Sequence, residues 1–492
     1  MRLSGLASGL DVDSMVKELM KARQSSYTNL VKKRTLSEWK QEDYRSISTK
    51  IVDFRNNKLT NYNMSNAISA KTSQVSGDTN ALTINSTSST ATGTISVEVT
   101  NVASTATELY SFSDPTQNVA LKDLGFTAEL DGSNNPTGNV VIKINDKTLS
   151  ISEDATLSEL ASFINTNSAA LKTTAVYAYD ANTGVSKLSL TGTKTGNDSL
   201  KIDAFATSTG FSEPKKTISV GSDASIVVNG ISYTSNNNRF AVNGMDFTVK
   251  AKTAVGNPST ITAVQDTSKI IDTIKSFVAD YNNIISSVNS ELSEARNRTF
   301  SPLTSDEKAE MNEDDVKNWQ DKARSGTLRN DSTLSRFVSD LRLAATSLVS
   351  GIKDSSGNSI QIGITTGSYS EKGKLVLDES KLRSALESNP EEVISLFSNN
   401  STGVFKKMTT TSMDALTELS KKAGTSLTST DLNSTFLVNS SLSTEINQMK
   451  LKETDMVKRL TRLETQYYKQ FTAMETAINK FNSQSGSLSS FM

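Results

Sequence analysis

Apolar residues near the N-terminus recur every three or four positions, which is the spacing of one face of an α-helix. The pattern includes Val12, Val16 and Leu19 and continues to Ile47 and Phe54. No proline occurs before position 115, and no glycine lies between positions 9 and 77. Because these two residue types break helices, the N-terminal segment is predicted to form a long helix.

The C-terminal segment carries a narrower apolar stripe, with the a/d spacing of a coiled coil over about six heptads and one phase shift. No glycine lies between Gly424 and Gly486, and no proline follows Pro390. The pattern therefore predicts a second long helix with an apolar stripe on an otherwise polar surface. The stripe consists of Leu442, Ile446, Met449, Met456, Leu460, Leu463 and Tyr467 and, after one inserted residue, Phe471, Met474, Ile478 and Phe481.

An apolar stripe this narrow is not satisfied on an isolated helix and needs a partner. One interpretation is an antiparallel pair with the N-terminal helix of the same chain. The other is docking onto other chains, and the two can hold at once. We define the docking stripe as Val12, Val16 and Leu19 together with the C-terminal stripe residues, and we predict it to be the assembly site.

The middle of the chain, residues 79–266, changes to the alternating pattern of β-strands. Apolar and polar residues alternate over Ile95–Val99 and Val140–Ile144. The Asn-Gly pairs at 229–230 and 243–244 each separate two strand-like runs, which is typical of a tight β-hairpin. One helix interrupts the strands, because Thr156 and Glu159 have the spacing of a capping box. This region is predicted to be an antiparallel α+β module.

Helical spacing returns after residue 266, where Ile270, Ile274 and Phe277 begin a wide apolar stripe typical of a buried helix. Since helical segments flank the β-rich region, the first and last thirds of the chain are predicted to fold together. The predicted fold class is multidomain α+β, with long terminal helices that form a coiled-coil leg. The predicted boundaries are 1–44 for the N-terminal helical leg segment, 45–78 plus 267–440 for a helical base, 79–266 for the inserted β-rich region with two subdomains, and 441–492 for the C-terminal coiled-coil leg segment.

The composition argues against most kinds of enzyme. The 492 residues include no His and no Cys, which excludes a Ser-His-Asp triad, a thiol nucleophile, a Cys- or His-based zinc site and a disulfide. Carboxylate, Lys and Tyr chemistry remains open. With 52 basic and 53 acidic residues, the net charge of −1 gives no bulk attraction for nucleic acid. We predict no catalytic residues, no cofactor and no metal.

We expect neither a secretory signal peptide nor a membrane-spanning helix. Asp11, Asp13 and Lys17 interrupt any apolar core of a signal peptide within the first twenty residues. No stretch approaches the roughly 18 apolar residues of a membrane-spanning helix, so no membrane insertion is predicted. The chain is therefore expected to be either cytosolic or exported by a route that needs no cleaved signal.

Several stretches together resemble one known family, the flagellar hook-associated protein 2 (FliD) family of filament-capping proteins. The opening SGLASGLDVDSMVKELMKARQSSYTNLVKKR is similar to the family's N-terminus, and RLETQYYKQFTAMETAINKFNSQSGSLSSFM to its C-terminus. FAVNGMDFTVKAKTAV and the following QDTSKIIDTIKSFVADYNNII resemble its junction between outer β region and main helix. The similarity is weak over residues 75–220. Outside this region, the similar stretches occur in the same order as in the family, from one end of the chain to the other.

The resemblance implies a non-enzymatic assembly factor at the distal tip of the growing bacterial flagellum, outside the cell. Such a protein retains exported flagellin and promotes its folding and insertion, so that filament elongation and motility depend on it. The implied partners are further copies of the chain, usually in a pentamer, together with flagellin, the flagellar type III export apparatus and an export chaperone. Export without a cleaved signal peptide is also implied.

The alternative function is that of a surface adhesin that binds host mucus or another receptor through the outer β domains. Some members of the family are associated with this role. It needs a receptor-binding face within residues 79–266, and the sequence shows no recognisable one. A hook–filament junction protein or a flagellin is a further alternative, but such proteins lack the matched region 267–400.

Overall fold

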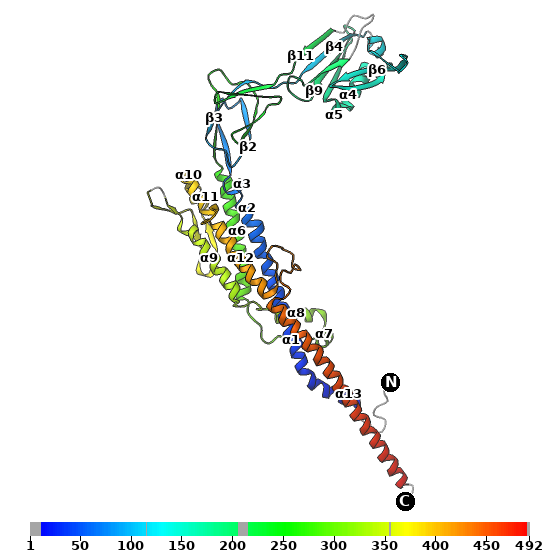
Figure 1. Ribbon diagram of the computed structural model, residues 1–492, viewed down its shortest axis with the longest axis vertical. Coiled ribbons are helices and arrows are strands. Elements are labelled where there is room, and N and C mark those ends of the chain that lie inside the picture. The colour runs from blue at the N-terminus through cyan, green and yellow to red at the C-terminus, as the bar shows by residue number, and fades with distance from the viewer. Residues whose placement is uncertain (1–10, 115, 205–214, 354–355, 490–492) are drawn as a thin grey trace. The chain divides into compact units, whose positions relative to one another are not determined.

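The computed structural model describes residues 11–114, 116–204, 215–353 and 356–489. The chain divides into two compact units (Figure 1). We call Met1–Ser69 with Thr267–Met492 the helical unit, and Ala70–Asp266 the β unit. Both chain ends therefore belong to the same unit, and the β unit is inserted between them. The predicted α+β class, with long terminal helices and antiparallel sheets, is confirmed.

The helical unit is built mainly from long helices, with two short β-hairpins between α9 and α10. The π-helix η1 follows α1 directly, and the 3₁₀-helix η3 lies between β19 and β20. The helices are α1 (Val12–Asp53), η1 (Phe54–Leu59), α2 (Thr60–Tyr62), α3 (Ser65–Ile68), α6 (Thr267–Ser293), α7 (Ser305–Ala309), α8 (Glu313–Arg324), α9 (Ser332–Ser350), η3 (Tyr369–Glu371), α10 (Glu379–Ser388), α11 (Pro390–Ser398), α12 (Val404–Ala423) and α13 (Ser441–Ser489). The hairpin strands are β17 (Ile352–Lys353), β18 (Ser359–Ile360), β19 (Ile364–Thr366) and β20 (Leu375–Leu377).

Helix α6 forms the centre of the core of the helical unit. The wide stripe predicted from the sequence is buried, including Ile270, Ile274 and Phe277. The Phe277 ring lies 5.1 Å from Phe405 of α12 and 6.0 Å from Phe397 of α11, both in edge-to-face contact. Such aromatic pairs stabilise a core beyond the area that they bury. This cluster therefore fixes α11 and α12 against α6.

A buried polar group joins three helices that are distant in sequence. Asp331 caps the N-terminus of α9 by accepting from the N–H groups of Thr333 and Leu334, both at 3.0 Å. Its second oxygen accepts from the Tyr44 hydroxyl at 2.6 Å and from Lys422 at 3.2 Å. Tyr44 belongs to α1 and Lys422 to α12, so a single carboxylate holds α1, α9 and α12 together.

The same contacts determine the protonation of this group. Burial by itself would raise the pKa of Asp331, but the hydrogen bonds from Tyr44 and the Leu334 N–H, with the charge of Lys422, outweigh it and lower the pKa. Burial, and then Asp331 itself, raises the pKa of the Tyr44 phenol. The network is therefore an ionised carboxylate with a neutral phenol at neutral pH.

The β unit consists of antiparallel sheets and short helical segments. The larger sheets have the strand orders β1-β16-β3-β12-β13, β11-β4-β9-β8, β10-β6-β5 with β7 beside β6, and β14-β15-β2. The elements are β1 (Lys71–Gly77), β2 (Leu82–Thr87), β3 (Thr94–Asn101), β4 (Thr107–Ser113), the 3₁₀-helix η2 (Leu121–Leu124), β5 (Ala128–Leu130), β6 (Pro136–Ile144), β7 (Lys147–Ser152), α4 (Leu157–Thr166), α5 (Ser168–Leu171), β8 (Thr173–Asp180), β9 (Val185–Gly192), β10 (Ile202–Ala204), β11 (Lys215–Ser219), β12 (Ala224–Val228), β13 (Ile231–Ser235), β14 (Arg239–Val242), β15 (Met245–Val249) and β16 (Ser259–Gln265).

Two hydrophobic clusters stabilise this unit. One contains Val97, Ile226, Phe247 and Ile261 from the sheets of β3, β12, β15 and β16. The other contains side chains of β4, β6 and β9 and of helix α4, including Ile164. Both predicted Asn-Gly hairpins are confirmed, since Val228 pairs with Ile231 and Val242 with Met245 across two-residue turns. The predicted capping box at the start of α4 is also present.

The predicted boundary between helical base and β region at residue 78 is wrong. Residues 71–77 form strand β1, which pairs along its whole length with β16. The sequence of β1 is polar and only its alternate side chains are half-buried. Such an edge strand is held by backbone hydrogen bonds and lacks the apolar alternation by which strands are recognised. The β unit therefore begins at Ala70.

An asparagine from α4 covers the open edge of strand β8. The side-chain amide of Asn165 donates to the carbonyl of Ala175 and its oxygen accepts from the Ala175 N–H, both at 2.8 Å. These are the two bonds that a neighbouring strand would otherwise form. Exposed strand edges are templates for aggregation, so the contact protects the β unit as well as stabilising it.

Asn165→Asp removes the amide donor and places a carboxylate against the Ala175 carbonyl. We expect it to destabilise the β unit by about 1–3 kcal/mol, the cost of leaving buried polar groups unpaired. Urea unfolding of the full chain followed by circular dichroism measures this effect. The matched change Asn182→Asp, at an exposed turn residue, is expected to cost less than about 0.5 kcal/mol. Equal stability of the two variants contradicts the assignment.

Candidate docking surface

The two helices that carry the docking stripe lie side by side and run antiparallel (Figure 1). Gln41 of α1 donates to Ser443 near the start of α13 at 2.9 Å. Nearer the other end, the Tyr468 hydroxyl donates to Asp13 at 3.0 Å. Residue numbers therefore rise along one helix as they fall along the other. The interpretation of the stripe as an intrachain pair is correct for this part of its length.

The far end of the pair has a small apolar contact of its own. Val12, Val16 and Met20 of α1 are buried there. Predicted stripe residues of α13 pack on them and are half-buried, namely Leu460, Leu463, Tyr467 and Phe471. Helix α1 begins here because Asp11 accepts from the N–H of Ser14 at 2.9 Å and caps the helix. The hydroxyl and the N–H of Ser14 lower the pKa of Asp11, which therefore keeps its charge at the positive end of the helix.

Leu19 of the predicted docking stripe takes no part in this intrachain contact, and its assignment to docking stays a prediction. Leu19 is 44% exposed, whereas Met20 is 6% exposed and faces α13. Val12, Val16 and Met20 form a row at four-residue spacing, and α13 packs along that row. Leu19 lies about 100° around the helix from Met20. Met20 lies at i+4 from Val16 and Leu19 at i+3, so helical spacing alone fits either residue.

Ion pairs join α1 and α13 in the middle of the helix pair. Arg34 of α1 binds Glu453 of α13 at 2.7 Å and Glu38 of its own helix at 2.6 Å. Lys450 lies 3.4 Å from the same Glu38. Burial lowers the pKa of Arg34, but the two carboxylates outweigh it and raise the pKa. The predicted residue Met456, within this stretch, is half-buried.

The first turns of α13 are attached to the core. Ile446 and Met449 are buried, and Leu442 is half-buried. Helix α13 contacts α12 as well as α1 in this region. These three stripe residues are therefore part of the fold of the helical unit rather than of an open surface.

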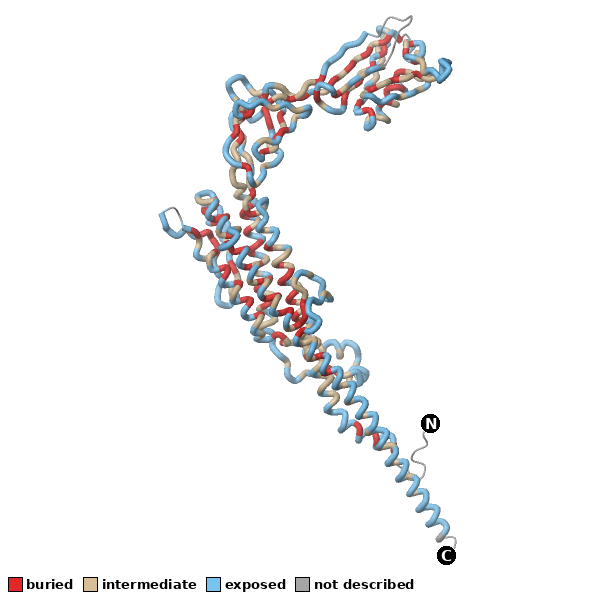
Figure 2. Tube along the Cα trace, viewed as in Figure 1, coloured by how far each residue is buried: buried red, intermediate tan, exposed pale blue. Residues whose placement is uncertain are grey.

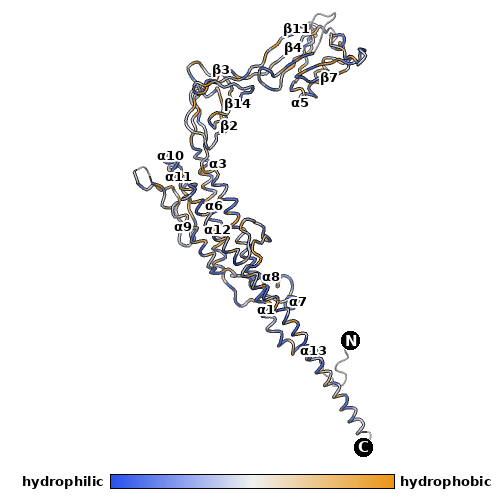
Figure 3. Tube along the Cα trace, in the orientation of Figure 1, coloured by the Kyte–Doolittle hydropathy of each residue, from blue (hydrophilic) through white to orange (hydrophobic). Residues whose placement is uncertain are grey.

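The last part of α13 differs from the rest. Phe471 packs on the start of α1, and α13 continues to Ser489 with no α1 partner among the described residues. Met474 is exposed, Ile478 is half-buried and Phe481 is 69% exposed. Figure 2 shows this change as a run of exposed positions toward the C-terminus, and Figure 3 shows hydrophobic positions within the same helix. This segment carries an apolar stripe without a covering element in the described chain.

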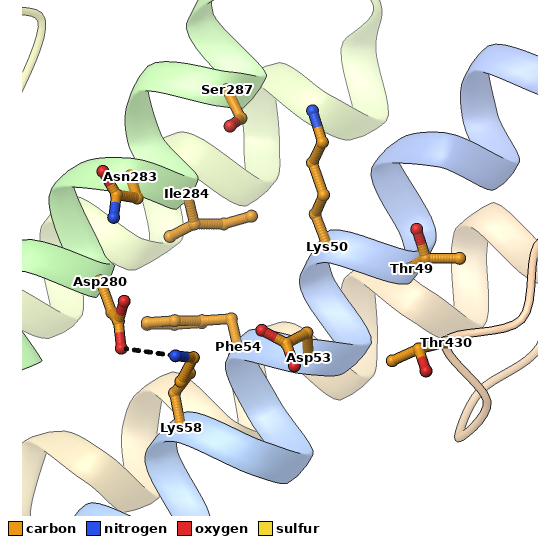
Figure 4. A pocket seen from close by; sticks show the side chains of 10 residues that line it. All are labelled: Thr49, Lys50, Asp53, Phe54, Lys58, Asp280, Asn283, Ile284, Ser287 and Thr430. Carbon is orange, nitrogen blue, oxygen red and sulfur yellow. Dashed lines mark ion pairs between the residues drawn. The ribbon is translucent and has the colours of Figure 1, made fainter.

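The helical unit also has a pocket of about 450 Å³ where α1 and η1 face α6 (Figure 4). Lys58 points toward Asp280 and pairs with it at 3.5 Å, and the same carboxylate accepts from the Tyr62 hydroxyl at 2.5 Å. Burial, and then Asp280, raises the pKa of Tyr62, so this phenol is neutral at neutral pH. The pocket is lined by Thr49, Lys50, Asp53, Phe54, Lys58, Asp280, Asn283, Ile284, Ser287 and Thr430.

Within the described ranges, no group of three or more Asp and Glu side chains has the arrangement of a metal site. No helix in the part of the chain that the structure describes is long and apolar enough to cross a bilayer.

Comparison with known proteins gives a consistent result. The family profile described as "Flagellar hook-associated protein 2 C-terminus" matches residues 221–483, and the corresponding N-terminus profile matches residues 8–106. The flagellar hook-associated protein 2 of Halalkalibacterium halodurans is 26% identical, over 100% of this chain and 99% of its own. That of Escherichia coli K12 is 24% identical, over 98% of this chain and 96% of its own. A solved structure of the flagellar cap protein FliD (domains D1-D2-D3) from Escherichia coli covers 85% of this chain and 99% of its own, with 20% identity and a TM-score of 0.46.

Proposed function

Because the chain belongs to the flagellar hook-associated protein 2 family, we propose that it caps the distal end of the growing flagellar filament. In this role it retains exported flagellin and promotes its folding and insertion, so that elongation and motility require it. The observation that supports this most is the apolar stripe of α13 beyond Phe471, which no element of the described chain covers. A cap must hold the filament end through a surface that its own fold leaves uncovered.

We propose flagellin as the partner of this stripe. Met474, Ile478 and Phe481 continue the coiled-coil spacing of the helix, and such a stripe fits an amphipathic helix of a partner. The intrachain pair with α1 holds α13 as far as Phe471. The helix is therefore already formed and oriented before it docks, which reduces the entropy lost on binding.

The proposed role is structural rather than catalytic. The chain contains no His and no Cys, and the relatives are named as flagellar hook-associated proteins. Further parts of the proposal are assembly of several copies, with a pentamer as the expected number, and a position outside the cell. We also propose export through the flagellar apparatus without a cleaved signal peptide, assisted by an export chaperone.

Deletion of the gene tests the proposed function. We expect cells without the protein to secrete flagellin as soluble monomer and to carry short filaments or none. Flagellin in the culture medium is measured by quantitative immunoblot, and filament length by electron microscopy. Restoration by the wild-type gene is the control. Filaments of normal length in the deletion strain contradict the proposal.

A further inference from the structure

The segment between α12 and α13, residues 424–440, exposes several large apolar side chains. Phe436 is 59% exposed and Val438 is 77% exposed, and Leu432 and Leu437 are also exposed. We call residues 431–438 the apolar loop. Solvent-exposed apolar residues that gather in one short segment often mark an interaction surface.

Hydrogen bonds hold this loop in place at its base. The N–H of Phe436 donates to the Gly424 carbonyl at 3.0 Å, and Thr425 and Thr435 form an antiparallel bridge. Side chains of η1 hold the preceding residues, because Asn56 donates to the carbonyl of Thr428 at 3.1 Å. The loop is thus attached on the side of the helical unit formed by α1 and η1, and its apolar side chains are exposed.

An apolar groove of about 470 Å³ lies where α9 faces the β19–β20 hairpin. Leu343, which is 72% exposed, lines it together with Val349 and Leu375. Arg342 also lines the groove and forms no ion pair within the described residues. Gly373 permits this position of the arginine, since a Cβ there would lie 2.6 Å from the Cδ and Nε atoms of Arg342.

The loop and the groove lie on different sides of the helical unit. In Figure 1 the loop is the orange segment beside α1, whereas α9 lies across the unit, with α12 between them. Helix α12 packs on both α1 and α9, which agrees with this placement. One copy of the chain therefore cannot bring its own loop into its own groove.

We propose that the apolar loop of one copy enters the α9–hairpin groove of a second copy. The charges are complementary, because Asp431 is exposed and forms no ion pair among the described residues, and Arg342 offers the matching cation. The contact is heterologous, joining one surface to a different one, and such contacts repeat around a ring when the rotation closes. This proposal rests on the proposed function in one respect, because the loop–groove contact would join neighbouring subunits of a cap.

Engineered cysteines test the contact in the full-length protein, because the natural chain has none. A mixture of Leu343→Cys and Phe436→Cys single variants is expected to form a disulfide-linked dimer under mild oxidation, whereas each variant alone stays largely monomeric on a non-reducing gel. The double variant is expected to give a ladder of covalent oligomers. Preferential dimers of either single variant indicate a symmetric contact and overturn the proposal. If the protein sediments as oligomers but the mixture of the two variants forms no disulfide-linked dimer, the proposed contact is also overturned.

Charge reversal provides a second readout. Arg342→Asp and Asp431→Arg are each expected to weaken self-association at least about tenfold, measured by sedimentation, because each places like charges in contact. The two substitutions combined in one chain are expected to restore it. Wild-type association in both single variants, or no recovery in the combination, contradicts the contact. The mixed disulfide together with normal filaments in the deletion strain would leave the contact intact and reject the capping function.

Discussion

Replacement of Leu460 and Leu463 by aspartate is expected to abolish filament growth while the core of the helical unit stays folded. Both side chains pack on Val12, Val16 and Met20. Two charges in this apolar contact cost several kcal/mol wherever it is formed. The contact orients the end of α13, so its loss removes the preformed docking surface.

The core should be unaffected because it lies elsewhere in the unit. Its buried residues, such as Ile47 and Phe277, take no part in the apolar contact between the start of α1 and α13. The expected melting temperature is within a few degrees of the wild-type value. Cells that carry the variant are expected to export it, to secrete flagellin monomer and to grow short filaments or none.

A matched control separates this effect from the addition of charge. Leu451 and Val457 are exposed on the same helix, and their replacement by aspartate is expected to leave filament length unchanged. Normal filaments with the Leu460/Leu463 variant contradict the docking role of this helix. A large loss of core stability instead assigns the stripe to the fold alone.

Asp331→Ala is expected to cause the largest loss of stability in the helical unit, about 3–5 kcal/mol. The substitution leaves Lys422 without its partner, removes the acceptor for the Tyr44 hydroxyl and removes the cap of α9. Asp340 on the same helix is an exposed carboxylate paired only loosely with Arg336 at 3.6 Å. Its replacement by alanine is expected to cost less than about 1 kcal/mol. Equal losses in urea unfolding contradict the proposed role of Asp331.

The lowered pKa of Asp331 gives this prediction a pH dependence. Its contribution is fully present above the unfolded pKa of about 3.9 and is lost as the pH falls through the lower folded value. Asp331→Asn retains a similar shape without the titrating group. The stability difference between wild type and Asp331→Asn is therefore expected to shrink as the pH is lowered from about 5 toward 2. A difference that is constant over this range rejects an ionised Asp331 as its source.

Periodic patterns predicted much of this fold. The stripe of α6, both Asn-Gly hairpins and the start of α4 could be predicted because their signals are local in sequence. The Asp331 network could not, since Tyr44 and Asp331 are 287 positions apart and nothing local marks the pair. Strand β1 was missed because its pairing depends on backbone groups rather than on side-chain pattern.

The candidate site shows the same limit. Periodicity identified the stripe residues Val12, Val16, Leu460 and Leu463, which meet in one contact. It gave no means of choosing between Leu19 and Met20, because that choice depends on where α13 lies around α1. Nor does spacing show which stripe residues an intrachain partner covers. Among the described residues, the structure divides the stripe into a part that contacts α1 and a part beyond Phe471 that has no covering element.

The central claim, that this chain caps the flagellar filament, is tested most directly by locating the protein on intact flagella. Gold-labelled antibody against the β unit, viewed by electron microscopy, is the measurement. The account predicts one cluster of label at the distal end of each filament and none along its length. Label spread over the cell surface or along the filament indicates an adhesin, and it would contradict the account, as would filaments with no label at the tip.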